Sequence, residues 1–420
     1  MTDKNLFPYD LAVVAIFKDE AEYLDEWIDY HFLAGVNHFY LYNNDSSDDY
    51  QKVLAPYIEK NLVTLTDWSG RLMMYPAYDD ATEKYRFECR YMAFIDIDEF
   101  IFPKTNQSIF EVVDEILSAD SKAAALGINW QIFGSNGKVK ADYSRGVLER
   151  FTGRAPNDWV VILSEDEMIG NVTIKSIVNP RRVDCWWSPH YANYFHGFHS
   201  VNSAGVKTLN ITGYPITTDK IVLNHYYTKS QEEFLNKINR GSPCRTINHR
   251  SKELFYSHDR NEIFDDSILK YRAARAENFS FETDAERTDR AEKTLIEILT
   301  QSSPFDAPAE FFIGKLETFL TCRALAEKFG TKIGDKSAEE YALVWIYQTL
   351  NKDGVLTYAD LQFFINALPE ILVRPFPLCK KILQVFSTNI LPAMRDAAKN
   401  LKTWKNYNNL RLLQRLLNSI

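Results

Sequence analysis

The segment that decides the fold is YMAFIDIDEFIFP, residues 91–103. Its first half is an apolar run typical of a buried strand, and the run ends in the acids Asp96, Asp98 and Glu99. Strand alternation would put the Asp96 and Asp98 carboxylates on one side, where two anionic oxygens bind a hard cation such as Mn²⁺ or Mg²⁺. Most Asp-x-Asp pairs are solvated surface acids, but the apolar flanks of this one favour a metal site.

Apolar runs of strand length alternate with helical patterns on both sides of this segment. Further strands are predicted at residues 11–17, 38–42, 62–65, 123–130, 172–178 and 220–227. Helices are predicted at residues 20–34 and 50–58, and Ser108 with Glu111 fits a capping box that begins another. This alternation predicts an α/β sheet that binds its ligands at the carboxyl ends of the strands.

The pattern changes near residue 283, after which helical periodicity continues without strand alternation. We therefore expect a sheet-containing domain at residues 1–280 and a helical domain at residues 281–420. Residues 394–420 hold six basic residues against one acid, together with an apolar face. Such a helix docks on an anionic membrane as a peripheral contact, or it packs on its own domain or on a partner subunit.

Composition excludes several classes of protein. The net charge of −9 argues against a nucleic-acid partner, which would require a broad basic surface. The five cysteines are scattered and form no Cys-x-x-Cys pair, so neither a disulfide framework nor a zinc site is indicated. The first apolar run is too short for a signal core, and no run reaches the roughly 18 residues of a membrane span. We expect a cytoplasmic protein.

Four blocks of sequence carry a resemblance to a known family. They are FKDEAEYLDEW (residues 17–27), FIDIDEF (94–100), NWQIFGSNG (129–137) and NHYYTKS (224–230). Together with the residues around them they span about residues 10–240, and they occur in the order found in glycosyltransferase family 92, once called domain of unknown function 23. The chain resembles the bacterial members of that family.

The resemblance implies a GT-A fold and an inverting transfer from a nucleotide-diphosphate sugar, with UDP-galactose the donor most associated with the family. The acceptor would be a glycan or a lipid-linked sugar. Two turns would hold the nucleoside. They carry Phe17, Lys18 and Glu20 in the first turn and Asn43 and Asp45 in the second. Asn43 stands where related transferases usually have Asp.

Several residues are candidates for the metal and the diphosphate. His225 would complete a set of metal ligands with Asp96 and Asp98, although a histidine on an apolar strand is more commonly structural. Asp96 would also contact the donor. Lys229 and Arg86 would pair with diphosphate oxygens, or they are ordinary surface charges.

The acceptor side and the general base stay open. Residues 130–137 combine an aromatic ring with a polar turn, as an acceptor platform would, but Trp130 is nearly as well explained as a core residue. Asp184 and His190 are our candidates for the base, and Glu149 and Asp219 are also available.

Two other functions remain as alternatives. A sugar nucleotidyltransferase also uses an α/β sheet and a divalent metal, but it needs a glycine-rich basic loop after the first strand, where this chain has acidic residues. A binding protein of the same fold without turnover would not need both Asp96 and Asp98.

Overall fold

The computed structural model describes residues 5–162, 168–195, 197–241, 244, 251–301, 312–350, 377–385 and 388. The chain divides into two compact units. The sheet unit comprises Tyr9–Tyr194 and Phe198–Glu282, and the helical unit comprises Met1–Pro8, Phe195–Gly197 and Thr283–Ile420. The basic segment predicted at residues 394–420 lies outside the described residues.

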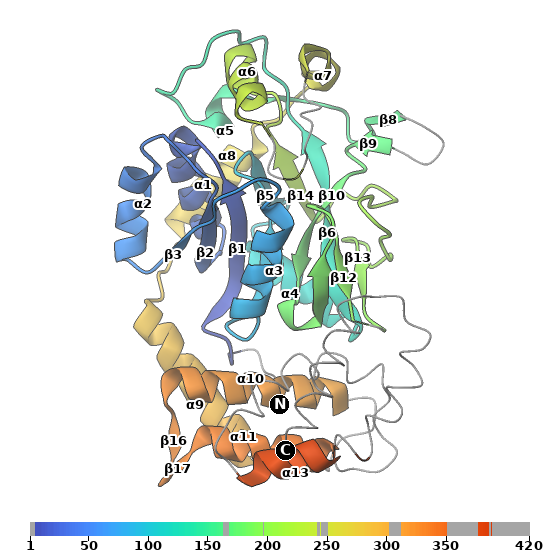
Figure 1. Cartoon of the computed structure of the whole chain (residues 1–420). Coiled ribbons are helices and arrows are strands. Elements are labelled where there is room, and N and C mark those ends of the chain that lie inside the picture. The colour runs from blue at the N-terminus through green and yellow to red at the C-terminus, as the bar shows by residue number, and fades with distance from the viewer. Residues whose placement is uncertain are drawn as a thin grey trace. The chain divides into compact units, whose positions relative to one another are not determined.

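The sheet unit begins with four parallel strands in the order β3-β2-β1-β4. β1 lies at the centre of this half and is buried nearly throughout, because its residues 11–17 are all apolar. A helix follows each of the first three strands and covers the sheet (Figure 1). The elements are β1 (Tyr9–Phe17), α1 (Ala21–Leu33), β2 (His38–Asn43), α2 (Tyr50–Glu59), β3 (Val63–Asp67), α3 (Met74–Tyr85) and β4 (Cys89–Phe94).

The second half of the sheet is mixed. β10 pairs antiparallel with both β4 and β6, β14 runs parallel to β6, and β5 closes the edge antiparallel to β14. The full order β3-β2-β1-β4-β10-β6-β14-β5 confirms the predicted α/β class and GT-A arrangement. The additional strands are β5 (Glu99–Pro103), β6 (Ala123–Ile132), β10 (Ile174–Val178), β13 (His199–Val201), which pairs with β6, and β14 (Ile221–His225).

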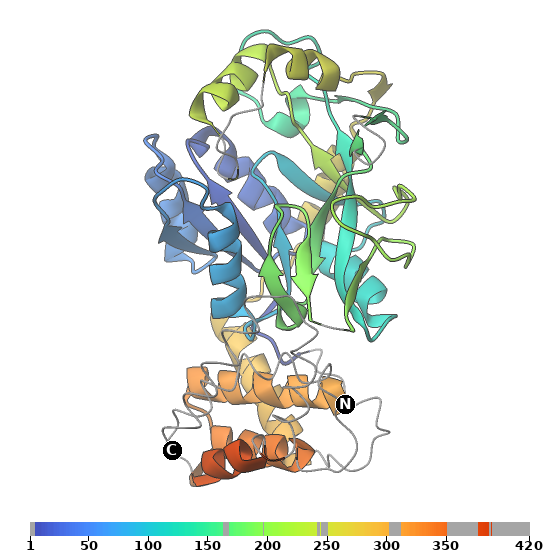
Figure 2. The same cartoon turned by 45° about the vertical axis from the view of Figure 1, so that its right-hand side comes forward.

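Shorter elements surround this sheet. Both views place α6 and α7 at the end of the sheet where the parallel strands terminate (Figures 1 and 2). The helices are α4 (Ile109–Ser118), α5 (Val147–Arg150), α6 (Gln231–Arg240), α7 (Lys252–His258), α8 (Ser267–Glu277) and the 3-10 turn η1 (Pro180–Arg182). Three ladders pair β7 (Gly153–Arg154) with β15 (Ile263–Phe264), β8 (Val160–Ile162) with β9 (Met168–Gly170), and β11 (Val183–Trp186) with β12 (Ala192–Tyr194).

The decisive segment, residues 91–103, differs from the expectation in one respect. It forms two strands, β4 and β5, and the residues between them make a turn in which Glu99 N–H donates to the Asp96 carbonyl at 3.1 Å. Strand alternation therefore does not orient Asp96 and Asp98, because both lie in the turn. Their direction is set by the tertiary contacts of β5.

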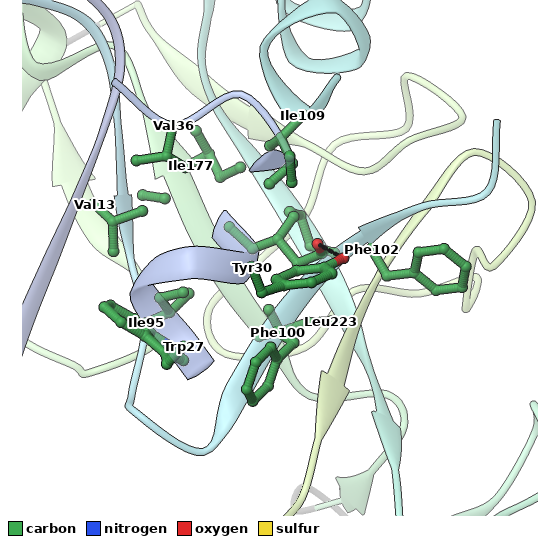
Figure 3. Packing of buried hydrophobic residues seen from close by; sticks show 14 of the residues in the cluster. Val13, Trp27, Tyr30, Val36, Ile95, Phe100, Phe102, Ile109, Ile177 and Leu223 are labelled. Atoms are coloured by element: carbon green, nitrogen blue, oxygen red, sulfur yellow. Dashed lines mark hydrogen bonds between the residues drawn. The ribbon is translucent and has the colours of Figure 1, made fainter. Parts of the chain in front are cut away.

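α1 provides those contacts. Trp27 Nε1 donates to the Glu99 carbonyl at 2.8 Å, and the Tyr30 hydroxyl donates to the Ile101 carbonyl at 2.8 Å. Figure 3 shows Tyr30 next to Phe100, with Trp27 to one side, and the Tyr30 and Phe100 rings meet edge to face at 5.3 Å. All three side chains are almost completely buried. Side chains of the main hydrophobic core therefore fix the position of β5, and with it the acidic turn.

Where the structure describes it, at residues 283–301, 312–350 and 377–385, the C-terminal region is helical as predicted, with one additional short ladder. Arg323 and Glu339 form a buried ion pair at 3.3 Å, and Trp345 Nε1 donates to the Leu299 carbonyl at 3.1 Å. Among the described helices, none combines the length and the apolar character that a transmembrane segment needs. The elements are α9 (Asp284–Gln301), α10 (Phe312–Phe329), β16 (Lys332–Ile333), β17 (Lys336–Ser337), α11 (Ala338–Leu350) and α13 (Pro377–Val385).

Candidate active site

A cleft of about 780 Å³ opens at the carboxyl ends of the central strands, where ligands of open α/β sheets bind. The end of β1, the acidic turn after β4 and the end of β14 form its floor. Residues that line the cleft include Phe17, Lys18, Glu20, Asn44, Arg71, Asp96, Asp98, Trp130, Trp187, His190, His225, Tyr227, Lys237 and Arg240.

The acidic turn carries two carboxylates, each paired with a lysine. Asp96 Oδ2 accepts a hydrogen bond from Lys175 Nζ at 3.0 Å, and Asp98 Oδ2 forms an ion pair with Lys237 Nζ. Burial raises the pKa of Asp98, but Lys237 and His225 outweigh burial and hold that pKa well below its ordinary value. Asp98 is therefore ionised at neutral pH although only 4% of its surface is exposed.

Glu99 stands behind the two aspartates. It is fully buried, and its Oε2 accepts the Asp96 N–H at 2.8 Å. Burial raises the pKa of Glu99 above its ordinary value, and Lys175 Nζ, 3.4 Å from Oε2, opposes that shift.

His225 reaches the cleft because it ends β14, opposite Glu99 of β5. Its Nε2 lies 3.5 Å from Asp98 Oδ1, and its Nδ1 lies 3.8 Å from Glu99 Oε1. Burial lowers the pKa of His225, which favours the neutral imidazole that binds metal ions. Asp98 Oδ1 and His225 Nε2 are thus close enough to contact one cation.

This pair fits a divalent cation that is shared with a ligand. Within the described ranges, no three His, Cys, Asp or Glu side chains converge closely enough to hold a metal by themselves. Cations that act with nucleotide phosphates need fewer protein ligands, because one or two side chains suffice and the phosphates and water complete the shell. Asp98 and His225 meet that requirement, with Asp96 as an additional charge.

The predicted nucleoside residues divide into two groups. Phe17, Lys18 and Glu20 line the cleft. Asn43 and Asp45 are not among its lining residues and shape the neighbouring loops instead. Asn43 Nδ2 donates to the Tyr50 hydroxyl at 2.9 Å, and Asp45 Oδ2 accepts the Gly70 N–H at 3.1 Å.

Asn44, the middle residue of the predicted nucleoside turn at residues 43–45, lines the cleft and fixes a neighbouring loop. Its Nδ2 donates to the carbonyls of Trp68 and Gly70, both at 2.9 Å. These bonds hold the loop that carries Arg71, an exposed cation at the cleft. The polar residues 43–45 at the end of a buried strand predicted a ligand-binding turn, but the sequence did not show that Asn44 is the one that lines the cleft.

The predicted diphosphate and base residues also divide. Arg86 is buried, and its carbonyl accepts from Arg181 Nη1 at 3.1 Å, whereas Lys229 places its ammonium 4.2 Å from the centre of the Tyr23 ring. Neither residue is among those lining the cleft, and Asp184, on β11, is not either.

His190 does line the cleft, beside Trp130 at a ring separation of 5.2 Å. Its Nδ1 lies 2.9 Å from the Ile174 carbonyl, so Nδ1 carries the proton and Nε2 keeps its lone pair. Burial and the charge of Lys175 lower the pKa of His190 to about 3. His190 is therefore neutral at physiological pH.

Besides Arg71, the sequence analysis missed two cations that line the cleft, Lys237 and Arg240, and one that pairs with Asp96, Lys175. Lys175 is fully buried on β10, and a lysine inside an apolar strand is a signal in its own right. Lys237 and Arg240 lie one turn apart on α6, where the i, i+3 spacing puts them on one face. Arg240 forms an ion pair with Glu20 and donates to the carbonyls of Lys18 and Asp19.

Comparison of the sequence with known proteins identifies a family. The profile of glycosyltransferase family 92 matches residues 12–270. A glycosyltransferase family 92 protein of Ricinus communis is 24% identical over 256 residues, which cover 60% of this chain and 42% of that protein. The chain thus spans about two fifths of this curated plant relative.

Two further similarities are more limited. The galactan beta-1,4-galactosyltransferase GALS2 of Arabidopsis thaliana is 33% identical over 98 residues, 21% of this chain and 19% of that protein. The solved structure of S. aureus TarS 1–349 in complex with UDP covers 81% of this chain at 10% identity, with a TM-score of 0.29. Because the family profile covers more than half of the chain, from β1 as far as α8, the protein belongs to glycosyltransferase family 92.

Proposed function

We propose that the chain is an inverting glycosyltransferase that moves galactose from UDP-galactose to a hydroxyl of a glycan or lipid-linked acceptor, with Mn²⁺ or Mg²⁺ as cofactor. The observation that carries the proposal is the pair of Asp98 and His225 at the floor of a cleft in a family 92 fold. The partial similarity to a galactan galactosyltransferase supports galactose as the sugar.

The donor half of the cleft is the wall formed by the end of β1 and by α6. Lys18, Arg71, Lys237 and Arg240 gather positive charge there, which suits a nucleoside diphosphate. A divalent cation held by Asp98, His225 and the diphosphate would neutralise the charge of the departing UDP. The residues themselves position the diphosphate and exclude water from it.

We assign the acceptor to the part of the cleft lined by Trp130, Trp187 and His190. We propose His190 as the general base. Its Nε2 accepts the proton of the acceptor hydroxyl while the hydroxyl oxygen attacks the anomeric carbon opposite UDP. The bond from that carbon to the diphosphate oxygen breaks, and UDP leaves with the electron pair. An anionic donor beside His190 raises the low pKa of the imidazole and makes it a stronger base.

A UDP-release assay tests this function. UDP-galactose and other UDP-sugars are incubated with the protein in Mn²⁺ and in EDTA. We expect release with UDP-galactose that EDTA abolishes and that Asp98→Asn lowers by about 10² or more, as for a lost transition-state charge contact. Asp120→Asn is the matched control, because Asp120 pairs with His199 outside the cleft.

His190→Ala separates the two halves of the site. It should lower turnover while leaving the binding of UDP with Mn²⁺ in calorimetry unchanged. Release of pyrophosphate instead of UDP would refute the transferase and favour a nucleotidyltransferase. Full activity of Asp98→Asn in EDTA would remove the metal from the proposal.

A further inference from the structure

α6 reaches over the cleft and brings Lys237 onto the acidic turn. The helix begins at a capping box made by Ser230 and Glu233, and Lys237 lies two turns further on. Lys237 Nζ contacts Asp98 Oδ2, and it also donates to the Tyr227 carbonyl at 3.2 Å. One ammonium thus occupies one carboxylate oxygen of Asp98, while His225 faces the other oxygen.

This ion pair is shielded from water. Only 9% of the Lys237 side chain and 5% of the Asp98 side chain are exposed. Removing one partner of such a pair leaves an uncompensated charge in a poorly solvated place, so the pair persists until another charge replaces it. A divalent cation that binds Asp98 therefore meets a positive charge that is already present.

In the same position, the Lys237 ammonium also lies against an aromatic ring of the cleft. The ammonium lies 4.3 Å from the centre of the Tyr227 ring, and Tyr227 itself lines the cleft. Arg240 anchors the same helix to Glu20 independently of Lys237. The flexible lysine stem can therefore change its partner by rotation, without movement of α6.

We propose that Lys237 is the resident counter-cation of Asp98. When the metal ion and the diphosphate bind together, the Lys237 ammonium leaves the Asp98 carboxylate to the metal ion and pairs with the diphosphate instead. The inference rests on the proposed function. It follows that the metal alone binds weakly, because it must displace Lys237 without offering the ammonium a new anion. The diphosphate supplies that anion, so metal and UDP strengthen the binding of each other to the same degree.

Mn²⁺ binding without turnover tests the inference. The concentration of free Mn²⁺ is measured by electron paramagnetic resonance during titration of the protein, with and without UDP. For the wild type we expect weak binding of Mn²⁺ alone and much tighter binding with UDP. Lys237→Met keeps the stem and removes the charge. It should tighten the binding of Mn²⁺ alone roughly tenfold or more, since a neighbouring charge shifts such equilibria by one to three decades.

Two further variants keep the result interpretable. Lys140→Met removes the same charge from an exposed residue that pairs with Glu232 at 3.4 Å, and it should leave Mn²⁺ binding unchanged. Lys237→Gln retains a donor toward the Tyr227 carbonyl and should behave as Lys237→Met does. It replaces Lys237→Met if circular dichroism shows that variant to be unfolded.

The two ways of failing are distinct. If the wild type binds Mn²⁺ with UDP but neither Lys237 variant gains affinity for Mn²⁺ alone, Lys237 does not compete for Asp98 and the inference is overturned. If the wild type binds no Mn²⁺ even with UDP, the metal site of the proposed function fails, and this inference fails with it.

Discussion

His31 lies where α1 meets the strand that begins at the acidic turn. Its Nδ1 donates to the Trp27 carbonyl at 2.8 Å, and its Nε2 accepts the Ile101 N–H at 3.2 Å. The second bond requires a neutral ring, because a protonated Nε2 has no lone pair to accept with. Burial lowers the pKa of His31 from 6.5 to about 3. Between these two pH values the unfolded state binds a proton at His31 and the folded state does not.

The sign of the pH dependence follows. The contribution of His31 to stability is complete above pH 6.5 and is lost as the pH falls from there toward 3. Between pH 7 and pH 5.5 the wild type should lose about 1 kcal/mol through this residue. His31→Gln should be less stable at pH 7, because its hydrogen bonds are poorer, and the deficit should shrink by that amount at pH 5.5. Urea unfolding at both pH values measures it, and a deficit independent of pH would contradict the prediction.

Two helices of the sheet unit begin with the same device, a capping box. Ser230 and Glu233 begin α6, and Ser108 and Glu111 begin α4. α6 carries Lys237 and Arg240 to the cleft, whereas no residue of α4 lines it. We expect Ser230→Ala and Ser108→Ala each to lower the free energy of unfolding by about 1 kcal/mol. Only Ser230→Ala should also weaken the binding of UDP, because it loosens the helix that holds both cations.

Calorimetric titration of UDP with Mn²⁺ and urea unfolding separate these effects. Equal UDP affinity in both variants would mean that the start of α6 does not position the two cations. Weaker binding in Ser108→Ala alone would instead point to a route through α4, which packs against β5 and β6.

The sequence was sufficient where an element is defined by its own residues. The apolar runs at residues 11–17 and 123–130 became β1 and β6, and the capping box at Ser108 formed as predicted. The division of residues 91–103 into β4 and β5 was not predictable, because the apolar pattern continues on both sides and contacts with Trp27 decide the break.

The site shows the same division. Asp96, Asp98 and His225 were predicted as metal ligands, and His190 was one of several candidates for the base; all four line the cleft. The ion pairs of Lys175 and Lys237 join strands and helices far apart in the sequence, and no local pattern reports them.

At the scale of the whole molecule, the chain consists of two units, and the residues that line the cleft belong to the sheet unit. The helices α10 and α11, in contrast, are held together by contacts of the helical unit such as the Arg323–Glu339 pair. A ligand that binds only the folded sheet unit stabilises that unit by mass action. Its effect on the helical unit depends on how strongly the two units unfold together.

We predict that UDP with Mn²⁺ protects the sheet unit selectively in hydrogen exchange. At a ligand concentration of 100 times Kd, amides of β1, β14 and α6 that exchange through unfolding of the sheet unit should slow about 100-fold. Amides of α10 and α11 should exchange at unchanged rates, because their unfolding releases no ligand. Asp98→Asn is the control and should lose the protection. Equal slowing in α10 and α11 would instead show that the two units unfold as one, so that a ligand at the cleft stabilises the entire chain.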